Sequence, residues 1–222
     1  MEREVSVLRV FTAIDGTGGN HLGVLLESAD LDDVACQNIA AHLAYSETVF
    51  VDDVALGKCR IFTPAIPLPF AGHPMVGTAW LLAHVGAAPS ELLPPAGVVS
   101  CWKDGDDWWV RAQADWCPDW TLLEADSAAD IDAAQPPAAK VSEYRWAWTD
   151  RAAGEVRARA FASAVGIVED EATGSAAIRL AAALQVPLVI AQGRGSRLLA
   201  APFGSGEAAV GGAVVLEGHR GI

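Results

Sequence analysis

The sequence predicts an α+β fold of two similar lobes, each built from a sheet around a central apolar helix. Residues 73–85 and 174–185 are strongly apolar, as expected of helices buried in a core. Short apolar segments between turn residues are typical of strands. A weak Arg-x-Phe-x repeat starts at residues 9, 60 and 159, and its last two copies each precede a small-residue loop and then an apolar helix. The repeat indicates that the two halves share one architecture.

In the first half, a strand, a turn and a returning strand are followed by an amphipathic helix, two further strands and a proline-rich loop. The corresponding residues are 5–14, 15–20, 22–26, 31–43, 48–51, 59–63 and 64–72. The glycines at 16–19 do not form a dinucleotide-binding loop, because a strand follows them instead of a helix. Pro74 fits the first position of the central helix, where a missing N–H costs nothing.

The second half begins with a predicted hairpin and a predicted linker. Residues 98–102 and 108–112 flank an Asp-Gly-Asp turn. Residues 117–140 are acidic, alanine-rich and contain proline, which favours a linker. Strands are expected before and after the second helix, at residues 144–148, 156–161, 188–191, 198–203 and 208–216.

The composition narrows the possible partners. The formal net charge is −13 and the pI is about 4.6, so nucleic acid and acidic membrane surfaces are excluded as partners. A small anion stays possible, since one helix N-terminus can hold a carboxylate. No segment resembles a signal peptide or a transmembrane helix, which favours the cytoplasm. The four cysteines and five histidines show no metal-ligand spacing, so no metal site is expected and the cysteines are interpreted as buried thiols.

The starts of the two apolar helices are candidate anion sites. Gly72 and Gly174 allow close backbone approach, and the free N–H groups of a helix start favour a carboxylate or oxyanion. Ser175 or Thr173 could add a hydroxyl donor. On the residues alone, the favoured interpretation is that one of these two hydroxyls simply caps a core helix.

Three titratable residues lie next to these segments. Glu47 could act as a general acid/base if a dry pocket raised its pKa, although most glutamates in such loops are solvated. Asp170 belongs to an acidic run that could serve only the helix dipole. His73 could be a packed ring or a helix cap. If the lobes face each other, His73 and Asp170 would meet.

These segments together resemble the PhzF-like family, which is related to diaminopimelate epimerase. The strings that carry the resemblance come in the family's order and are Gly19-Asn20, Ser46-Glu47-Thr48-Val49-Phe50, Arg60-Ile61-Phe62-Thr63-Pro64, Leu68-Pro69-Phe70-Ala71-Gly72-His73-Pro74 and Glu169-Asp170-Glu171-Ala172-Thr173-Gly174-Ser175-Ala176. The resemblance implies two pseudo-symmetric lobes, each a mostly antiparallel sheet or barrel around a central helix, with the active site in the cleft. It implies a first lobe at residues 1–95 and a second, shortened lobe at 96–222, whose last strands could return to the first.

The resemblance also implies a chemistry. It indicates a cofactor-free and often homodimeric isomerase that relocates a proton and a double bond on a small cyclic carboxylate, in secondary-metabolite or antibiotic biosynthesis. The implied catalytic residues are Glu47, His73 and Asp170, and the implied substrate-binding residues are Asn20, Gly72, Gly174, Ser175 and Thr173. A binding protein without activity, or a lyase or hydrolase using the same residues, are the alternatives.

Some residues depart from the family's pattern. The epimerase relatives use two cysteines at the starts of their central helices, whereas the comparable positions here are Ala71 and Ala172. This disfavours two-thiol racemisation and leaves isomerisation by one carboxylate. His21 stands where the family commonly has proline, and Glu171 stands in a usually small or proline position. Seven tryptophans fall in the shortened region, and one or two of them are candidates for the pocket wall.

Overall fold

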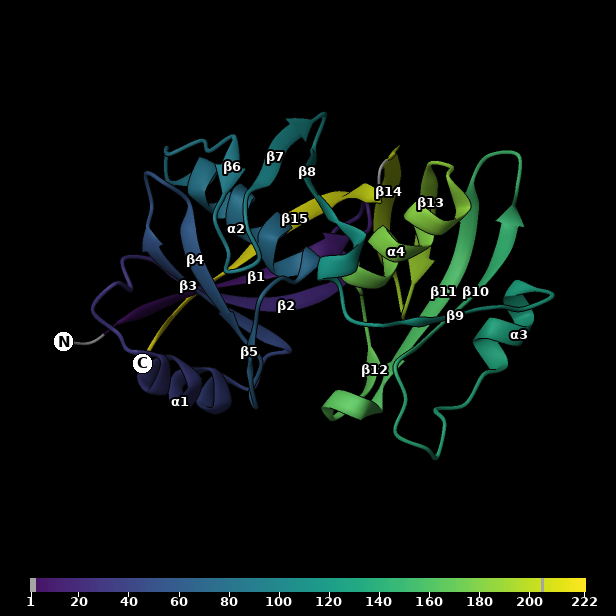
Figure 1. Cartoon of the computed structure of the whole chain (residues 1–222), viewed down its shortest axis with the longest axis horizontal. Helices are drawn as coiled ribbons and strands as arrows, with labels where there is room; N and C mark the ends of the chain where they lie inside the picture. The colour runs from purple at the N-terminus through teal and green to yellow at the C-terminus, as the bar shows by residue number, and fades with distance from the viewer. Residues whose placement is uncertain (1–2, 205) are drawn as a thin grey trace.

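The computed structural model describes residues 3–204 and 206–222 and contains two lobes side by side (Figure 1). The first lobe holds β1 (Glu4–Thr12), β2 (Gly18–Leu25), α1 (Asp33–Leu43), β3 (Glu47–Asp53), β4 (Lys58–Phe62), β5 (Pro67–Leu68) and α2 (Gly72–His84). Next come β6 (Glu91–Leu92), β7 (Val99–Asp104), β8 (Asp107–Gln113) and a short 3-10 turn, η1 (Ala114–Trp116). The described part of the chain contains no helix with the length and hydrophobicity that a bilayer crossing requires.

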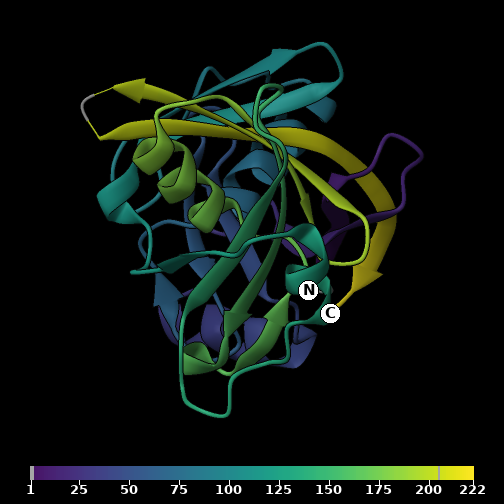
Figure 2. The ribbon, with the colours of Figure 1, turned by 90° about the vertical axis from the view of Figure 1, so that its right-hand side faces the viewer.

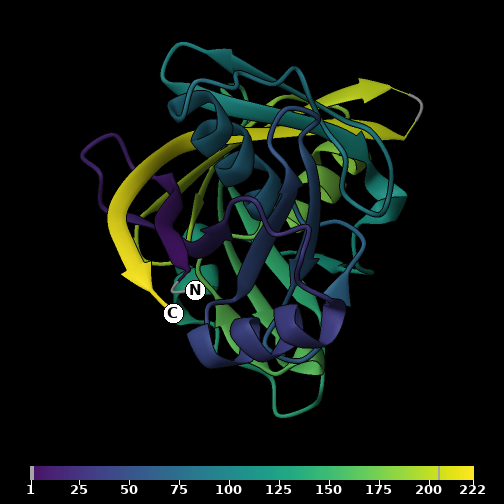
Figure 3. The ribbon, with the colours of Figure 1, turned by 90° about the vertical axis from the view of Figure 1, so that its left-hand side faces the viewer.

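The second lobe holds β9 (Thr121–Glu124), α3 (Ala128–Ala133), β10 (Glu143–Asp150), β11 (Glu155–Ala162), η2 (Ser163–Val165), β12 (Ile167–Asp170), α4 (Gly174–Leu184), β13 (Leu188–Gln192), β14 (Ser196–Gly204) and β15 (Glu207–Gly221). Turned views show sheet strands curving around α4 in this lobe (Figure 2) and around α2 in the other (Figure 3). The expected α+β class, with a sheet around each central helix, is confirmed.

One continuous sheet connects the lobes. Its main path runs β5-β4-β3-β2-β1-β15-β14-β13-β11-β10-β9, and most neighbours along it are antiparallel. The first part of β15 pairs with β8 and β14, and its later part pairs with β1. The last strand is therefore far longer than the sequence predicts, and in Figure 3 it bends along the first lobe toward the N-terminus. Backbone hydrogen bonds between Arg3 and Ile222 join the two ends.

The two halves repeat one order of elements. In the first half β2, α1 and β3 form a crossover between parallel strands, then β4 and β5 follow antiparallel and α2 enters the lobe. In the second half β9, α3 and β10 form the same parallel crossover, followed by antiparallel β11 and β12 and then α4. The predicted linker at 117–140 is wrong in part, because it contains β9 and α3, the counterparts of β2 and α1. Its alanine- and proline-rich composition hides this, and Ser127 caps α3 by accepting from the Asp130 N–H.

Two of the three arginines of the sequence repeat, Arg60 and Arg159, have matching roles. Arg60 on β4 donates to the carbonyls of Ser28 and Leu31, just before α1. Arg159 on β11 donates to the carbonyls of residues 131, 132 and 134, at the end of α3. Each guanidinium therefore fastens the outer helix region of its lobe to the strand that leads toward the cleft. The second and third copies of the sequence repeat therefore correspond to arginines that make equivalent hydrogen bonds in the two lobes.

The two central helices are the apolar centres of the lobes. Ten residues of α2 are buried, from Gly72 to Leu82, and seven of α4, from Gly174 to Ala181. Both helices belong to one large hydrophobic core that continues through both lobes. Because both begin at the boundary between the lobes, the fold brings their N-termini together, as Figure 1 shows.

Candidate active site

The N-termini of α2 and α4 meet backbone to backbone. A Cβ atom added to Gly72 would lie 2.8 Å from the carbonyl carbon of Gly174, and one added to Gly174 would lie 2.9 Å from the amide nitrogen of His73. Such distances do not occur for real side chains. Glycine is required at both positions because the two backbones touch, and so the positive ends of two helices converge on one point.

Neither helix start is capped by the side chain of its N-cap residue. The N-cap of α2 is Ala71, and that of α4 is Thr173, whose hydroxyl makes no capping bond. Instead the Thr173 Oγ1 donates to Asp170 Oδ2 at 2.7 Å. Ser175, the second residue of α4, accepts from Trp120 Nε1 at 3.1 Å. The interpretation that these hydroxyls serve as helix caps is therefore wrong, and the first N–H groups of both helices lack that partner.

A cavity of about 330 Å³ opens at this junction. The first lobe contributes its wall residues Glu47, Thr63, Ala65, Ile66, Leu68, Phe70, Ala71, Gly72 and His73, and the second contributes Pro118, Trp120, Ser142, Ala162, Ala164, Ile167, Asp170, Thr173, Gly174 and Ser175. Its acids, imidazole and hydroxyls are set among aliphatic and aromatic groups. A mostly apolar cavity with a few polar groups is the usual form of a small-molecule site.

Glu47 and His73 each place a buried polar atom without a hydrogen-bond partner, among the described residues, next to the cavity. Glu47 is the first residue of β3 and its side chain is 14% exposed, while that of His73, on α2, is 4% exposed. Glu47 Oε2 lies 3.4 Å from His73 Nε2, and neither atom has a hydrogen-bond partner in the described residues. Burial raises the pKa of Glu47 to about 7, and burial lowers the pKa of His73 to about 4. The imidazole is therefore neutral near pH 7 and the two do not form an ion pair.

Asp170 enters the cavity from the end of β12. Its Oδ1 accepts from Asn20 Nδ2 at 2.7 Å, and its Oδ2 accepts from Thr173. Burial, and then the nearby charge of Glu47, raise the pKa of Asp170 to about 6. Two carboxyls with raised pKa values thus share one dry pocket. Groups with such pKa values can give and accept protons at neutral pH.

Polar residues behind the cavity wall fix Asp170 and Thr173, and one of them, Gln192, could not be predicted from the sequence. Gln192, which is 1% exposed, donates to Thr173 Oγ1 at 2.8 Å and to the Asp170 carbonyl at 3.0 Å. The Tyr144 hydroxyl donates to Gln192 Oε1 at 3.0 Å. No local pattern marks Gln192, because its role depends on the pairing of β13 with β11 and β14.

The repeat makes the cavity pseudo-symmetric, with one exception in its chemistry. Thr48 pairs with Phe62 in the first lobe, and Glu143 pairs with Phe161 in the second. Because Phe62 and Phe161 are matching positions of the sequence repeat, the residue that corresponds to Glu47 is Ser142. Both line the cavity. Only one lobe therefore offers a carboxyl at this place.

The residues predicted to form the site converge, with one distinction. Lining the cavity are Glu47, His73, Asp170, Gly72, Gly174, Ser175 and Thr173. Asn20 is not a wall residue; its amide donates to Asp170 and to the Ala172 carbonyl and accepts from Ser46 Oγ. Asn20 thus holds Asp170 from behind. Trp120, one of the seven tryptophans in the shortened region, is part of the wall.

Comparison with known proteins places the chain in a family. The family model for phenazine biosynthesis-like proteins matches residues 8–107. The trans-2,3-dihydro-3-hydroxyanthranilate isomerase of Pseudomonas aeruginosa is 30% identical over 242 residues, which cover 85% of this chain and 87% of that protein. An uncharacterised isomerase of Mesorhizobium japonicum is 39% identical over 54% of this chain, an alignment that spans only 43% of that relative's own length.

The fold is also that of solved family members. A putative phenazine biosynthesis protein from Clostridium difficile has a TM-score of 0.81 and 17% identity, covering 99% of both chains. A hydroxyproline epimerase from Agrobacterium vitis has a TM-score of 0.63 and 12% identity, covering 100% of this chain and 92% of that one. The epimerase-like architecture expected from the motifs is therefore confirmed. The matched family model, the relative aligned over most of its length and the shared fold agree that this chain belongs to the phenazine biosynthesis-like (PhzF-like) family, as its motifs predict.

Proposed function

We propose that the protein is a cofactor-independent isomerase that relocates a proton, and with it a double bond, on a small cyclic carboxylate. The observation that carries the proposal is a pair of buried atoms, Glu47 Oε2 and His73 Nε2, for which residues 3–204 and 206–222 offer no hydrogen-bond partner. Both atoms lie on a cavity into which two helix N-termini open. A buried carboxyl oxygen without a partner costs free energy, and a ligand that hydrogen-bonds to it is the physical reason to expect it there. The relatives named as isomerases support the reaction class.

In the proposed reaction the substrate carboxylate lies at the helix starts, within reach of their N–H groups and the Ser175 hydroxyl. Glu47, as a carboxylate, removes a proton from a ring carbon next to a double bond. The electron pair left behind spreads through that double bond toward the carboxylate, where the helix ends stabilise the charge. Glu47 then returns the proton to the far carbon of the conjugated system. Atoms and electrons balance with no water and no oxidant.

The other polar residues have supporting roles in this proposal. Neutral His73 accepts a hydrogen bond from the protonated form of Glu47, which holds the carboxyl between its two transfers. Asp170, fixed by Asn20 and Thr173, meets the polar substituent of the substrate. Because the pKa of Glu47 is raised to about 7, both of its protonation states are populated at neutral pH, as a shuttle requires.

The sharpest test is Glu47→Gln, compared with the wild type and with Glu91→Gln as a surface control on β6. Trans-2,3-dihydro-3-hydroxyanthranilate and other cyclic dienyl acids would be incubated with each protein in deuterated water and followed by NMR and mass spectrometry. We expect the wild type and the control to give the isomer, and Glu47→Gln to give none while staying folded. The deuterium content of the product measures how far the proton carried by Glu47 exchanges with solvent between its two transfers. Full turnover by Glu47→Gln would refute the proposal.

Mass separates the two alternatives named from the sequence. A lyase or hydrolase would change the product mass by the group lost or by one water, whereas an isomerase in ordinary water changes it by nothing. A binding protein without activity would return the substrate unlabelled. A binding protein without activity would fit a solvated Glu47 and a filled or wide-open cleft. The unfilled cavity between the lobes and the mostly buried Glu47 favour the isomerase instead.

A further inference from the structure

The hydroxyl of Ser175 is oriented by its neighbour. The indole Nε1–H of Trp120 can only donate, so in the 3.1 Å bond between them the Ser175 Oγ is the acceptor. Its own hydrogen is left to be donated elsewhere. Ser175 is 9% exposed, and the surface it keeps lines the cavity. The bond to Trp120 occupies one lone pair of the Ser175 oxygen and restricts the rotation of the hydroxyl, whose hydrogen can still be donated into the cavity.

Trp120 is itself held by the helix that carries Ser175. Arg179 lies four residues after Ser175 and hence on the same face of α4. Its Nη2 donates to the Cys117 carbonyl at 2.9 Å and to Asp119 Oδ1 at 2.6 Å. These bonds fix the segment just before β9 against the helix. One face of α4 therefore supplies the hydroxyl and also fastens the chain that aims the indole at it.

The ring of Trp120 also contacts the layer behind Asp170. It packs edge-on against Tyr144, with 6.4 Å between ring centroids, and Tyr144 is fully buried and donates to Gln192. The indole is thus confined from two sides, by a hydrogen bond and by an aromatic contact. A side chain confined in this way can hold a fixed direction of hydrogen bonding at the site.

We propose that Trp120 is a positioning residue for anion binding, which directs the Ser175 hydroxyl onto a carboxylate held at the start of α4. This rests on the proposed function in one respect only, that the substrate's carboxylate lies at that helix start. The ring also forms part of the apolar wall, so the proposal assigns the N–H and the ring separate roles. Replacing Trp120 by phenylalanine removes the N–H and keeps an aromatic ring.

The test compares two fluorescent probes of nearly the same shape, 2-aminobenzoate and 2-aminobenzamide, in which a charged carboxylate is replaced by a neutral amide. Dissociation constants would be measured for the full-length wild type, Trp120→Phe, Ser175→Ala and the double variant. We expect Trp120→Phe to weaken binding of the acid about five- to tenfold, the effect of one misdirected hydrogen bond, and to leave binding of the amide unchanged. Ser175→Ala should cause a similar loss, and the double variant should be no worse than Ser175→Ala.

The matched control is Trp116→Phe in the same segment, whose ring contacts Phe70 instead of Ser175; both affinities should stay as in the wild type. Equal weakening of acid and amide would show a merely structural role for Trp120. Additive losses in the double variant, or a wild type that does not prefer the acid, would also overturn the inference. Its failure differs from that of the proposed function, since a carboxylate preference that depends on Trp120 can persist in a protein whose Glu47→Gln variant keeps full turnover.

Discussion

The buried carboxyl of Glu47 should cost the protein stability at high pH, and Glu47→Gln should recover it. The pKa of Glu47 rises from 4.5 in the unfolded chain to about 7 in the fold. Between these values the folded state binds more protons than the unfolded state, so stability falls as the pH rises through this window. At roughly 1.4 kcal/mol per pKa unit, the ionised carboxyl costs about 3 kcal/mol above pH 7.

Glutamine has the same shape and never ionises. We therefore expect Glu47→Gln to be close to the wild type in stability at pH 5, where Glu47 is protonated in the fold. At pH 8.5 the variant should be more stable by about 3 kcal/mol. Removing the charge of Glu47 also relieves Asp170, whose pKa that charge raises, which acts in the same direction.

The assay is urea unfolding at pH 5 and pH 8.5, followed by the fluorescence of the eight tryptophans. Glu91→Gln, at an exposed position of β6, serves as the control and should show no gain that depends on pH. A stability difference between Glu47→Gln and the wild type that is the same at both pH values would refute the reasoning. It would mean that the carboxyl is solvated or keeps a partner in the fold.

Two further predictions follow from the same pocket. His73→Asn should stabilise the protein at pH 4.5 and change its stability little at pH 7.5 in the same urea assay. Burial lowers the pKa of His73 from 6.5 to about 4, so the wild type loses stability as the pH falls through that window. Equal effects on stability at both pH values would contradict this. Gly72→Ala should weaken binding of 2-aminobenzoate and lower stability by about 1–3 kcal/mol, because its Cβ would meet the Gly174 backbone. Gly77→Ala is the control: its added Cβ would meet only side-chain atoms, and the variant should bind 2-aminobenzoate as the wild type does. A Gly72→Ala variant with wild-type affinity would show that the two helix starts can separate freely.

The sequence predicts the parts of the site that have local patterns. An apolar helix after a small-residue loop is visible twice, so the loops around Gly72 and Gly174 can be named as facing segments. What it leaves open is whether a hydroxyl such as that of Thr173 caps its own helix. The structure decides this because Asp170, three residues earlier, is close enough to take the hydroxyl's hydrogen bond.

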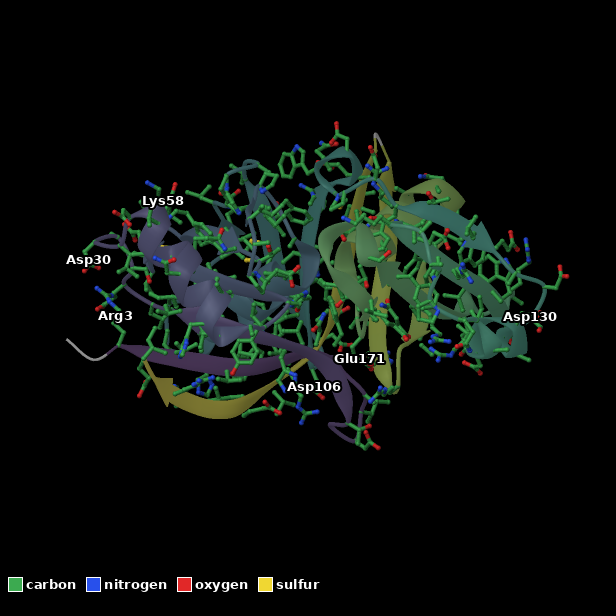
Figure 4. All side chains as sticks on the ribbon, turned by 90° about the horizontal axis from the view of Figure 1, so that it is seen from below. Arg3, Asp30, Lys58, Asp106, Asp130 and Glu171 are labelled. Carbon is green, nitrogen blue, oxygen red and sulfur yellow. The ribbon has the colours of Figure 1, made fainter. Side chains whose placement is uncertain are left out.

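Two other features are decided by contacts between distant residues. Glu171 was notable only as a departure from the family's pattern. Its Oε1 accepts from the Arg194 N–H and from Ser196 Oγ, and the Gly19 N–H donates to the same serine. Glu171 thus lies in the middle of the molecule, where the lobes join, as its position in Figure 4 shows. No pattern in residues 169–175 could indicate a partner more than twenty residues away.

The asymmetry between the halves bears on the stereochemistry of the proposed reaction. Duplicated lobes would give a cavity with equivalent groups on both faces of a substrate, which suits racemisation by two bases. Here Glu47 corresponds to Ser142, and neither helix start carries a thiol, since all four cysteines are buried elsewhere with raised pKa values. Asp170, the other carboxyl in the cavity, is held by Asn20 and Thr173 and in the proposed reaction meets a substituent of the substrate, which leaves Glu47 as the one base, on one face of the ring. In the proposed reaction a proton that Glu47 removes therefore comes back on the side it left, at another carbon, which moves a double bond instead of inverting a centre.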